Sequence, residues 1–167
     1  RKDRRHINDR DARLLAEVVT CKRNLEMSMD EEIVGIAASL AVDQATLVPE
    51  NRQEITTEGG LDCIAQRDRL EEVTQRLQDV GLVVSAFVDP EPDQIAAASE
   101  AGCEAIEIHT GTYANVWLEG GRDGERRAAE ALAQVRCGLN AALEAGLVVH
   151  AGHGLTYDNI GPAASLA

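Results

Sequence analysis

The stretch that decides the fold reads LVVSAFV and spans Leu82–Val88. It is rich in β-branched residues and apolar on both faces, which is typical of a strand buried in a parallel sheet. Pro92 and Asp93 suit the first turn of a helix, and we expect that helix to end near Ala101. The next apolar stretch, Ala105–His109, has the length of another strand. This strand–helix–strand order predicts a parallel α/β unit.

The same alternation extends in both directions along the chain. Further strands are predicted at Arg23–Met27, Ala45–Pro49 and Gly146–Ala151. Three of the remaining helices are predicted at Ala12–Val19, Leu61–Asp79 and Thr156–Ala167. Another should begin after an N-cap at Asp30 and run to Leu40, and a long Ala-rich helix should end near Ala145. The segments Glu50–Gly60 and Thr110–Gly124 are predicted to be loops. No low-complexity linker interrupts the pattern, so residues 1–167 are expected to form a single domain.

The arrangement favours a barrel over a dinucleotide-binding sheet. No GxGxxG motif follows the first strand, and no phosphate-binding GxxxxGK[ST] loop occurs. Instead, polar or ionisable residues recur at strand ends, as they do at the catalytic end of a barrel; these are Glu26, Glu50, Asp89, Glu107, His109 and His153. We therefore predict an α/β fold of the (β/α)8 TIM barrel type. About five βα units are present, so the chain is expected to be a barrel fragment truncated at both ends.

The composition narrows the range of functions. Asp and Glu number 29 against 16 Lys and Arg, which gives a formal net charge of −13. This charge argues against a nucleic-acid partner, although a local site can still bind small phosphorylated substrates. No apolar stretch is long enough to span a membrane. The four cysteines are dispersed without zinc-ligand spacing, so we expect reduced thiols, no metal and a cytoplasmic protein.

Three titratable residues are the strongest catalytic candidates. Glu107 lies between Ile106 and Ile108, and an acid within an apolar strand is costly unless it is paired or functional. Glu26 could act as a general base at a barrel mouth, or it could form a strand-end ion pair with Arg23 or a neighbouring lysine. His153 lies between two glycines and titrates near neutral pH, so it is a candidate acid or base.

Anion-binding candidates lie in three other places. Arg1, Arg4, Arg5 and His6 form a cationic segment, which is either a phosphate contact or an ordinary solvated end. The Gly154 amide could bind phosphate if a helix begins directly after it. The polar segment Glu50–Gly60, with its Thr56 hydroxyl, suits either a lid over a ligand or a plain surface loop.

Five segments together resemble the pyridoxine 5′-phosphate synthase family of vitamin B6 biosynthesis. They read DRRHINDRD (Asp3–Asp11), NLEM (Asn24–Met27), LVPENRQEITTEGGLD (Leu47–Asp62), EIHTG (Glu107–Gly111) and AGHGLTY (Ala151–Tyr157). The resemblance runs in order along the whole chain. It implies a (β/α)8 barrel that assembles as a homo-octamer and uses no cofactor.

The resemblance also implies a reaction and a set of site residues. The family condenses 1-deoxy-D-xylulose 5-phosphate with 3-amino-2-oxopropyl phosphate, releasing phosphate and water. Glu26 would be a proton acceptor, His153 a proton donor and Glu107 a further active-site carboxylate. The residues implied to contact substrate phosphates are Arg1, His6, Thr56 and Gly154. Compared with the family, the chain lacks the first strand, most of the second and the last.

Two alternatives remain open at this stage. One is another TIM-barrel enzyme that acts on phosphorylated sugars. A Schiff-base aldolase of that kind should carry a lysine at a strand end, but Lys2 and Lys22 lie elsewhere. The other is an inactive fragment retained as a binding or assembly partner.

Overall fold

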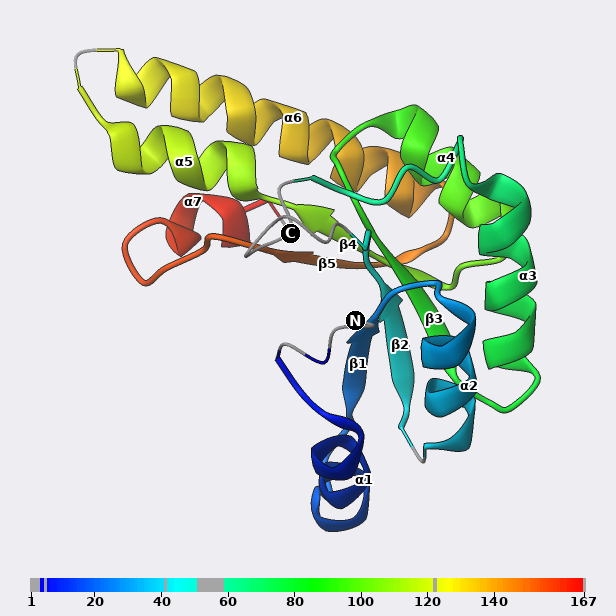
Figure 1. The fold of residues 1–167 in the computed structure, drawn as a ribbon. Coiled ribbons are helices and arrows are strands. Elements are labelled where there is room, and N and C mark those ends of the chain that lie inside the picture. Colours follow the sequence, from blue (N-terminus) through cyan, green and yellow to red (C-terminus); the bar gives the residue numbers. More distant parts are fainter. Residues whose placement is uncertain (1–3, 5, 41, 51–58, 122, 167) are drawn as a thin grey trace.

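A computed structural model describes residues 4, 6–40, 42–50, 59–121 and 123–166 (Figure 1). Its strands are β1 (Asn24–Met27), β2 (Gln44–Leu47), β3 (Val83–Val88), β4 (Ala105–His109) and β5 (Val148–Gly152). Its helices are α1 (Asp9–Val18), α2 (Glu31–Ser39), α3 (Arg67–Gln78), α4 (Pro92–Glu100), α5 (Gly111–Glu119), α6 (Gly124–Glu144) and α7 (Ile160–Ala164). None of the helices within these ranges is long and apolar enough to cross a lipid bilayer.

The five strands form one parallel sheet in the order β1-β2-β3-β4-β5. Each strand therefore pairs with the next strand along the chain. A doubly wound sheet reverses its strand order at a switch point, whereas a barrel wall does not. When every right-handed strand–helix–strand crossover adds its new strand at the same edge, all the crossover helices lie on one side of the sheet. Figure 1 shows this arrangement for α2, α3, α4 and α6. The predicted parallel α/β architecture is confirmed.

The sheet face toward these helices is apolar. Alternate residues of every strand point to this face, and most of them belong to the main buried core; they are Met27, Ala45, Leu47, Val84, Ala86, Val88, Ile106 and Ile108, with Leu25 and Val149 partly buried against them. From the helices, Val34, Leu70 and Ile95 contribute fully buried side chains. This aliphatic core fixes which residues of each strand are left for the opposite face.

The opposite face of the sheet is largely polar. Its polar residues are Asn24, Glu26, Gln44, Thr46, Ser85, Glu107, His109 and His150, and its apolar ones are Val83, Phe87, Ala105 and Val148. The Thr46 hydroxyl donates to Asn24 Oδ1 across this face at 2.9 Å. Because acids and histidines are costly to bury without a partner, this face is where the sheet can present chemistry.

Local sequence signals set several helix boundaries. Asp30 accepts a hydrogen bond from the Glu32 amide and caps α2, as predicted. Helix α4 begins at Pro92, where a missing amide proton costs nothing. Helix α1 begins three residues earlier than predicted, because Asn8 is its N-cap and accepts a hydrogen bond from the Asp11 amide.

Three further predictions about elements and their bounds were wrong. The segment Thr110–Gly124 is not a loop, since α5 occupies most of it and packs against α6. Helix α3 begins at Arg67 rather than Leu61, because the Leu61 amide donates to Phe87 O and the Cys63 amide to Gln94 Oε1. Helix α7 covers only Ile160–Ala164, after a turn in which Asn159 Oδ1 accepts from the Thr156 amide.

Candidate functional site

Glu107 lies on the polar face of the sheet at β4, as its alternation with Ile106 and Ile108 predicts. Burial raises its pKa above the ordinary value, and the negative charge of Glu26 raises it further, while His109 acts in the opposite direction. The carboxylate lies over Gly152 of β5, where any Cβ would overlap Glu107 Oε1. A glycine at this position therefore makes room for the acid.

Glu26 projects from β1 onto the same polar face. The alternative of an ion pair with Arg23 is wrong, because Arg23 Nε binds Asp43 Oδ2 at 3.1 Å and its Nη1 donates to Ala16 O. Glu26 instead acts electrostatically on both Glu107 and His153. The two predicted catalytic acids, from strands β1 and β4, thus belong to one electrostatic cluster.

His153 follows β5 and completes this cluster. Burial lowers its pKa below the ordinary value, His109 lowers it further, and Glu26 opposes both. Its ring lies 4.9 Å from that of His109 and 6.2 Å from that of Phe87, measured between centroids. The structure therefore brings together Glu26, Glu107 and His153, the three residues predicted to be catalytic.

A pair that sequence reasoning left without a role lies beside them. Asp89 follows β3, His109 ends β4, and His109 Nδ1 is 2.8 Å from Asp89 Oδ1. The hydrogen bond to His109 is the main cause that lowers the pKa of Asp89. The sequence places both residues at strand ends. They are 20 residues apart along the chain, however, and come together only because β3 and β4 are neighbours in the sheet.

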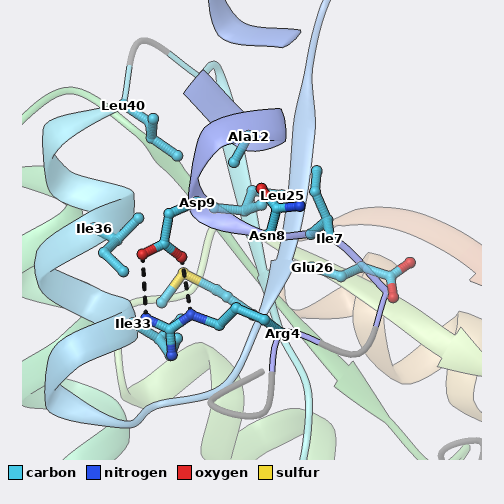
Figure 2. A pocket seen from close by; sticks show the side chains of 11 residues that line it. Arg4, Ile7, Asn8, Asp9, Ala12, Leu25, Glu26, Ile33, Ile36 and Leu40 are labelled. Atoms are coloured by element: carbon cyan, nitrogen blue, oxygen red, sulfur yellow. Dashed lines mark hydrogen bonds and ion pairs between the residues drawn. The ribbon is translucent and has the colours of Figure 1, made fainter. Parts of the chain in front are cut away.

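The cationic segment is only partly described. Arg4 Nε binds Asp9 Oδ1 at 2.9 Å, and Arg4 Nη2 binds Glu32 Oε1 at 2.7 Å, so this guanidinium already contacts two carboxylates. Figure 2 shows the Arg4–Asp9 pair beside Ile33 and Ile36, with Glu26 pointing away from it. The cavity there has a volume of about 40 Å³, which suits a few water molecules rather than a sugar phosphate.

The other predicted phosphate contacts have different outcomes. Arg1 and Thr56 lie outside the described residues, as does most of the predicted lid. His6 is described and exposed. Gly154 follows His153, but the expectation that a helix begins directly after it was wrong, because α7 begins only at Ile160. The Gly154 amide therefore does not lie at the N-terminus of a helix, and the predicted phosphate contact gains no support from that kind of anion site.

Metal and thiol chemistry find little support in the described part of the chain. It contains no group of three or more His, Cys, Asp or Glu side chains placed to hold a metal ion. All four cysteines are free, as expected from their spacing. Burial raises the pKa of Cys63 to about 12 and that of Cys103 to about 11, so both remain thiols at neutral pH and are poor nucleophiles.

Comparison with known proteins gives a consistent result. The family model described as "Pyridoxal phosphate biosynthesis protein PdxJ" matches residues 1–167. A protein named pyridoxine 5′-phosphate synthase from Geotalea uraniireducens is 49% identical over 99% of this chain and 67% of its own length. Proteins of the same name from Trichlorobacter lovleyi and Salinibacter ruber are 50% and 53% identical, over 100% and 95% of this chain and 67% and 63% of their own lengths. The chain thus spans about two thirds of these relatives.

A solved structure supports the fold. The crystal structure of a xylose isomerase domain protein from Planctomyces limnophilus matches with a TM-score of 0.54 at 13% identity, covering 86% of this chain and 59% of that one. At this identity the likeness concerns the fold alone. It agrees with a TIM-barrel-like arrangement of the five parallel strands.

Proposed function

The chain belongs to the PdxJ family of pyridoxal phosphate biosynthesis proteins, and from this premise we propose that it serves as a pyridoxine 5′-phosphate synthase. Its substrates would be 1-deoxy-D-xylulose 5-phosphate and 3-amino-2-oxopropyl phosphate. The observation that carries the proposal is the electrostatic cluster of Glu26, Glu107 and His153, contributed by β1, β4 and the residue that follows β5. Forming a ring from a ketose phosphate and an amino ketone needs repeated proton transfers, so several acid/base groups must converge.

Each member of the cluster suits a different proton transfer. The raised pKa of Glu107 keeps more of this carboxyl protonated, so it can donate a hydrogen bond or a proton to a substrate oxygen. The lowered pKa of His153 makes its imidazolium a stronger acid but leaves less of it at neutral pH, so as the proposed proton donor the ring would take up a proton in one step and donate it in a later one. Glu26, exposed on the polar face of the sheet, is the proposed proton acceptor. His150 lies on the same face, and no role is proposed for it.

Substrate binding is assigned by family resemblance. Arg1, His6 and Thr56 would contact the deoxyxylulose phosphate, and the Gly154 amide would contact the phosphate of the amino ketone. Positive charge and amide donors are the groups that bind phosphate in proteins, even in one with a formal charge of −13. The left-handed φ of +76° at Gly154 favours glycine, and a Cβ there would lie only 2.7 Å from Ala114 Cβ, so both the turn and the close approach of α5 require glycine.

The proposal includes a closed (β/α)8 barrel formed by one domain that assembles as a homo-octamer in the cytoplasm. Three features support closure: the strand order follows the chain, the face away from the helices is polar, and an apolar hollow of about 230 Å³ lies beside β5. Residues of β4, β5, α6 and α7 line this hollow. A further βα unit would pack there and cover β5.

The test is an assay of the complete gene product for pyridoxine 5′-phosphate from the two phosphorylated substrates. We expect Glu26→Gln and His153→Ala to lower kcat by about 100-fold or more, since general acid–base catalysis contributes roughly 10²–10⁴-fold. Glu71→Gln is the matched control, because Glu71 lies on the exposed side of α3 away from the cluster. It should retain wild-type kcat.

Two results would contradict the proposal. One is a folded wild-type enzyme that forms no pyridoxine 5′-phosphate. The other is full activity in both cluster variants, which would show that Glu26 and His153 take no part in the chemistry. Product formed from other sugar phosphates alone would favour a different barrel enzyme.

A further inference from the structure

The main chain of His153 is held in a conformation that is rare for a residue with a side chain. Its φ is +82°, in the left-handed region that favours glycine. Such strain persists only where the surroundings enforce it, and it clusters at functional sites. Here the fully buried Thr110 enforces it, since its amide donates to Gly152 O at 2.8 Å and its hydroxyl lies 2.7 Å from Gly152 O and 2.8 Å from His153 O.

The ring of His153 is oriented by neighbouring rings. His109 lies closest, at 4.9 Å between centroids with the planes at 64°, and Phe87 lies at 6.2 Å. A Cβ at residue 111 would overlap His109 Nε2 and lie 3.1 Å from His153 Cδ2. Gly111 therefore lets the two imidazoles approach each other with no side chain between them.

His109 is itself fixed by Asp89. Only 6% of the His109 side chain is exposed, and its Nδ1 lies 2.8 Å from Asp89 Oδ1. The Asp89 carboxylate also accepts the amide of Gly60, and these bonds hold its pKa below the ordinary value. A charged carboxylate only accepts hydrogen bonds, so the proton of a neutral His109 lies on Nδ1 and the lone pair on Nε2.

The burial of His109 Nε2 lowers the stability of the fold, so its presence calls for an explanation. It is buried and has no hydrogen-bond partner among the described residues. An unsatisfied buried polar atom lowers stability, and a phenylalanine or leucine would fill this space without that cost. A histidine at this place, held by an acid, is better explained by its effect on the neighbouring imidazole than by packing.

We propose that Asp89 and His109 form a positioning pair that holds the ring of His153 in its working orientation at the carboxyl end of β5. This inference rests on the proposed function, in which His153 transfers a proton to substrate. His109 does not reach substrate, because its side chain is buried, Nε2 included. It acts by setting the place and the ionisation of His153.

The charged groups around His153 give the sign of the expected change. Burial and His109 lower the pKa of His153, and Glu26 raises it. Two further carboxylates lie nearby: Glu107 faces Gly152, the residue before His153, and Asp89 is hydrogen-bonded to His109. Removal of the His109 ring removes a neighbour that lowers the pKa of His153 and part of the burial of that residue. Both losses raise the pKa of His153.

Two variants of the complete gene product test the pair. His109→Asn can keep a donor toward Asp89 while removing the part of the ring that carries Nε2. Asp89→Asn keeps the shape but can donate as well as accept, so it no longer fixes the tautomer of His109. Asp93→Asn is the control, since it makes the same change at an exposed carboxylate in the first turn of α4.

Both variants should lower kcat by about 10- to 100-fold, which is the scale of a misplaced catalytic group, and change KM less than about threefold. The kinetic pKa of His153 should rise in His109→Asn. Histidine ¹⁵N resonances supply a readout independent of turnover: wild-type His109 should carry its proton on Nδ1, His153 should titrate at higher pH in His109→Asn, and the Nδ1–H preference should weaken in Asp89→Asn.

Wild-type kcat in both folded variants, with an unshifted titration of His153, would overturn the pair and leave the proposed function standing. A wild-type enzyme without synthase activity would overturn the proposed function. The NMR titration would still decide whether His109 controls His153.

Discussion

The raised pKa of Glu107 makes stability depend on pH at a single residue. Burial disfavours its charged form in the folded protein, whereas the unfolded chain ionises near the ordinary value of 4.5. Between these two pKa values the folded state binds more protons, so stability falls as pH rises through this window. Above the window the loss is complete.

We therefore expect Glu107→Gln to gain stability relative to wild type as pH rises from about 4 to 8, because an amide carries no charge to bury. Urea unfolding at several pH values measures this difference. Glu71→Gln, the same substitution at an exposed position of α3, is the control. A difference for Glu107→Gln that does not change with pH would mean that its carboxyl ionises freely in the folded protein.

At the scale of elements, Tyr113 of α5 connects this helix to the turn before α7. Its side chain is 1% exposed, and its hydroxyl donates to Asn159 O at 2.7 Å. Asn159 is fully buried, so its carbonyl loses a partner if the hydroxyl is removed. One side chain thus fixes the position of the turn that follows His153.

Tyr113→Phe should cost about 1 kcal/mol of unfolding free energy, the usual loss when a buried hydrogen bond is broken. Urea denaturation should show a lower midpoint with an unchanged slope. Tyr157→Phe makes the same chemical change at a fully exposed position and should stay within about 0.5 kcal/mol of wild type. Equal midpoints for the two variants would show that the Tyr113 hydroxyl contributes nothing.

The strands were predictable from sequence because their evidence is local. Leu82–Val88 and Ala105–His109 are short apolar stretches bounded by turn residues, and both form strands within one residue of the predicted ends. Alternation within Ala105–His109 also placed Glu107 on the polar face. Periodicity and turn chemistry are properties of neighbouring residues, so one sequence suffices to find them.

Helix α5 could not be predicted because glycines surround it and its cause is distant. Gly111, Gly120 and Gly121 indicate a loop, yet Tyr113 and Val116 bury an apolar face against α6 and stabilise the helix. The Asp89–His109 pair was missed for a similar reason. Each residue is ordinary alone, and only the β3–β4 register brings them together.

At the scale of the whole molecule, the two outer strands differ from the three inner ones. The inner strands are almost entirely buried, whereas β1 and β5 are largely exposed, with Val148 of β5 58% exposed. An exposed strand edge with apolar side chains invites pairing with another strand. In a closed barrel the neighbour would be the next strand of the same chain.

Val148→Lys tests this closure in the complete gene product. If a further strand covers β5, the lysine must bury its ammonium group, and stability should fall by at least about 2 kcal/mol in thermal or urea unfolding. Val80→Lys is the control, because Val80 is similarly exposed at 51% but lies in the turn after α3. Equal stability of the two variants would mean that β5 remains at the edge of an open sheet.

The strand order has a consequence for how the chain folds during synthesis. Each described strand after β1 pairs with the strand translated just before it. None of the described strands is inserted later between two strands that were translated earlier. Each new βα unit can therefore add to the existing sheet as it leaves the ribosome, at roughly 5–20 residues per second. The growing edge would always be the newest strand, while the first strand would keep its own unpaired edge until the barrel closes, so a pause in translation would leave these two edges open to chaperones.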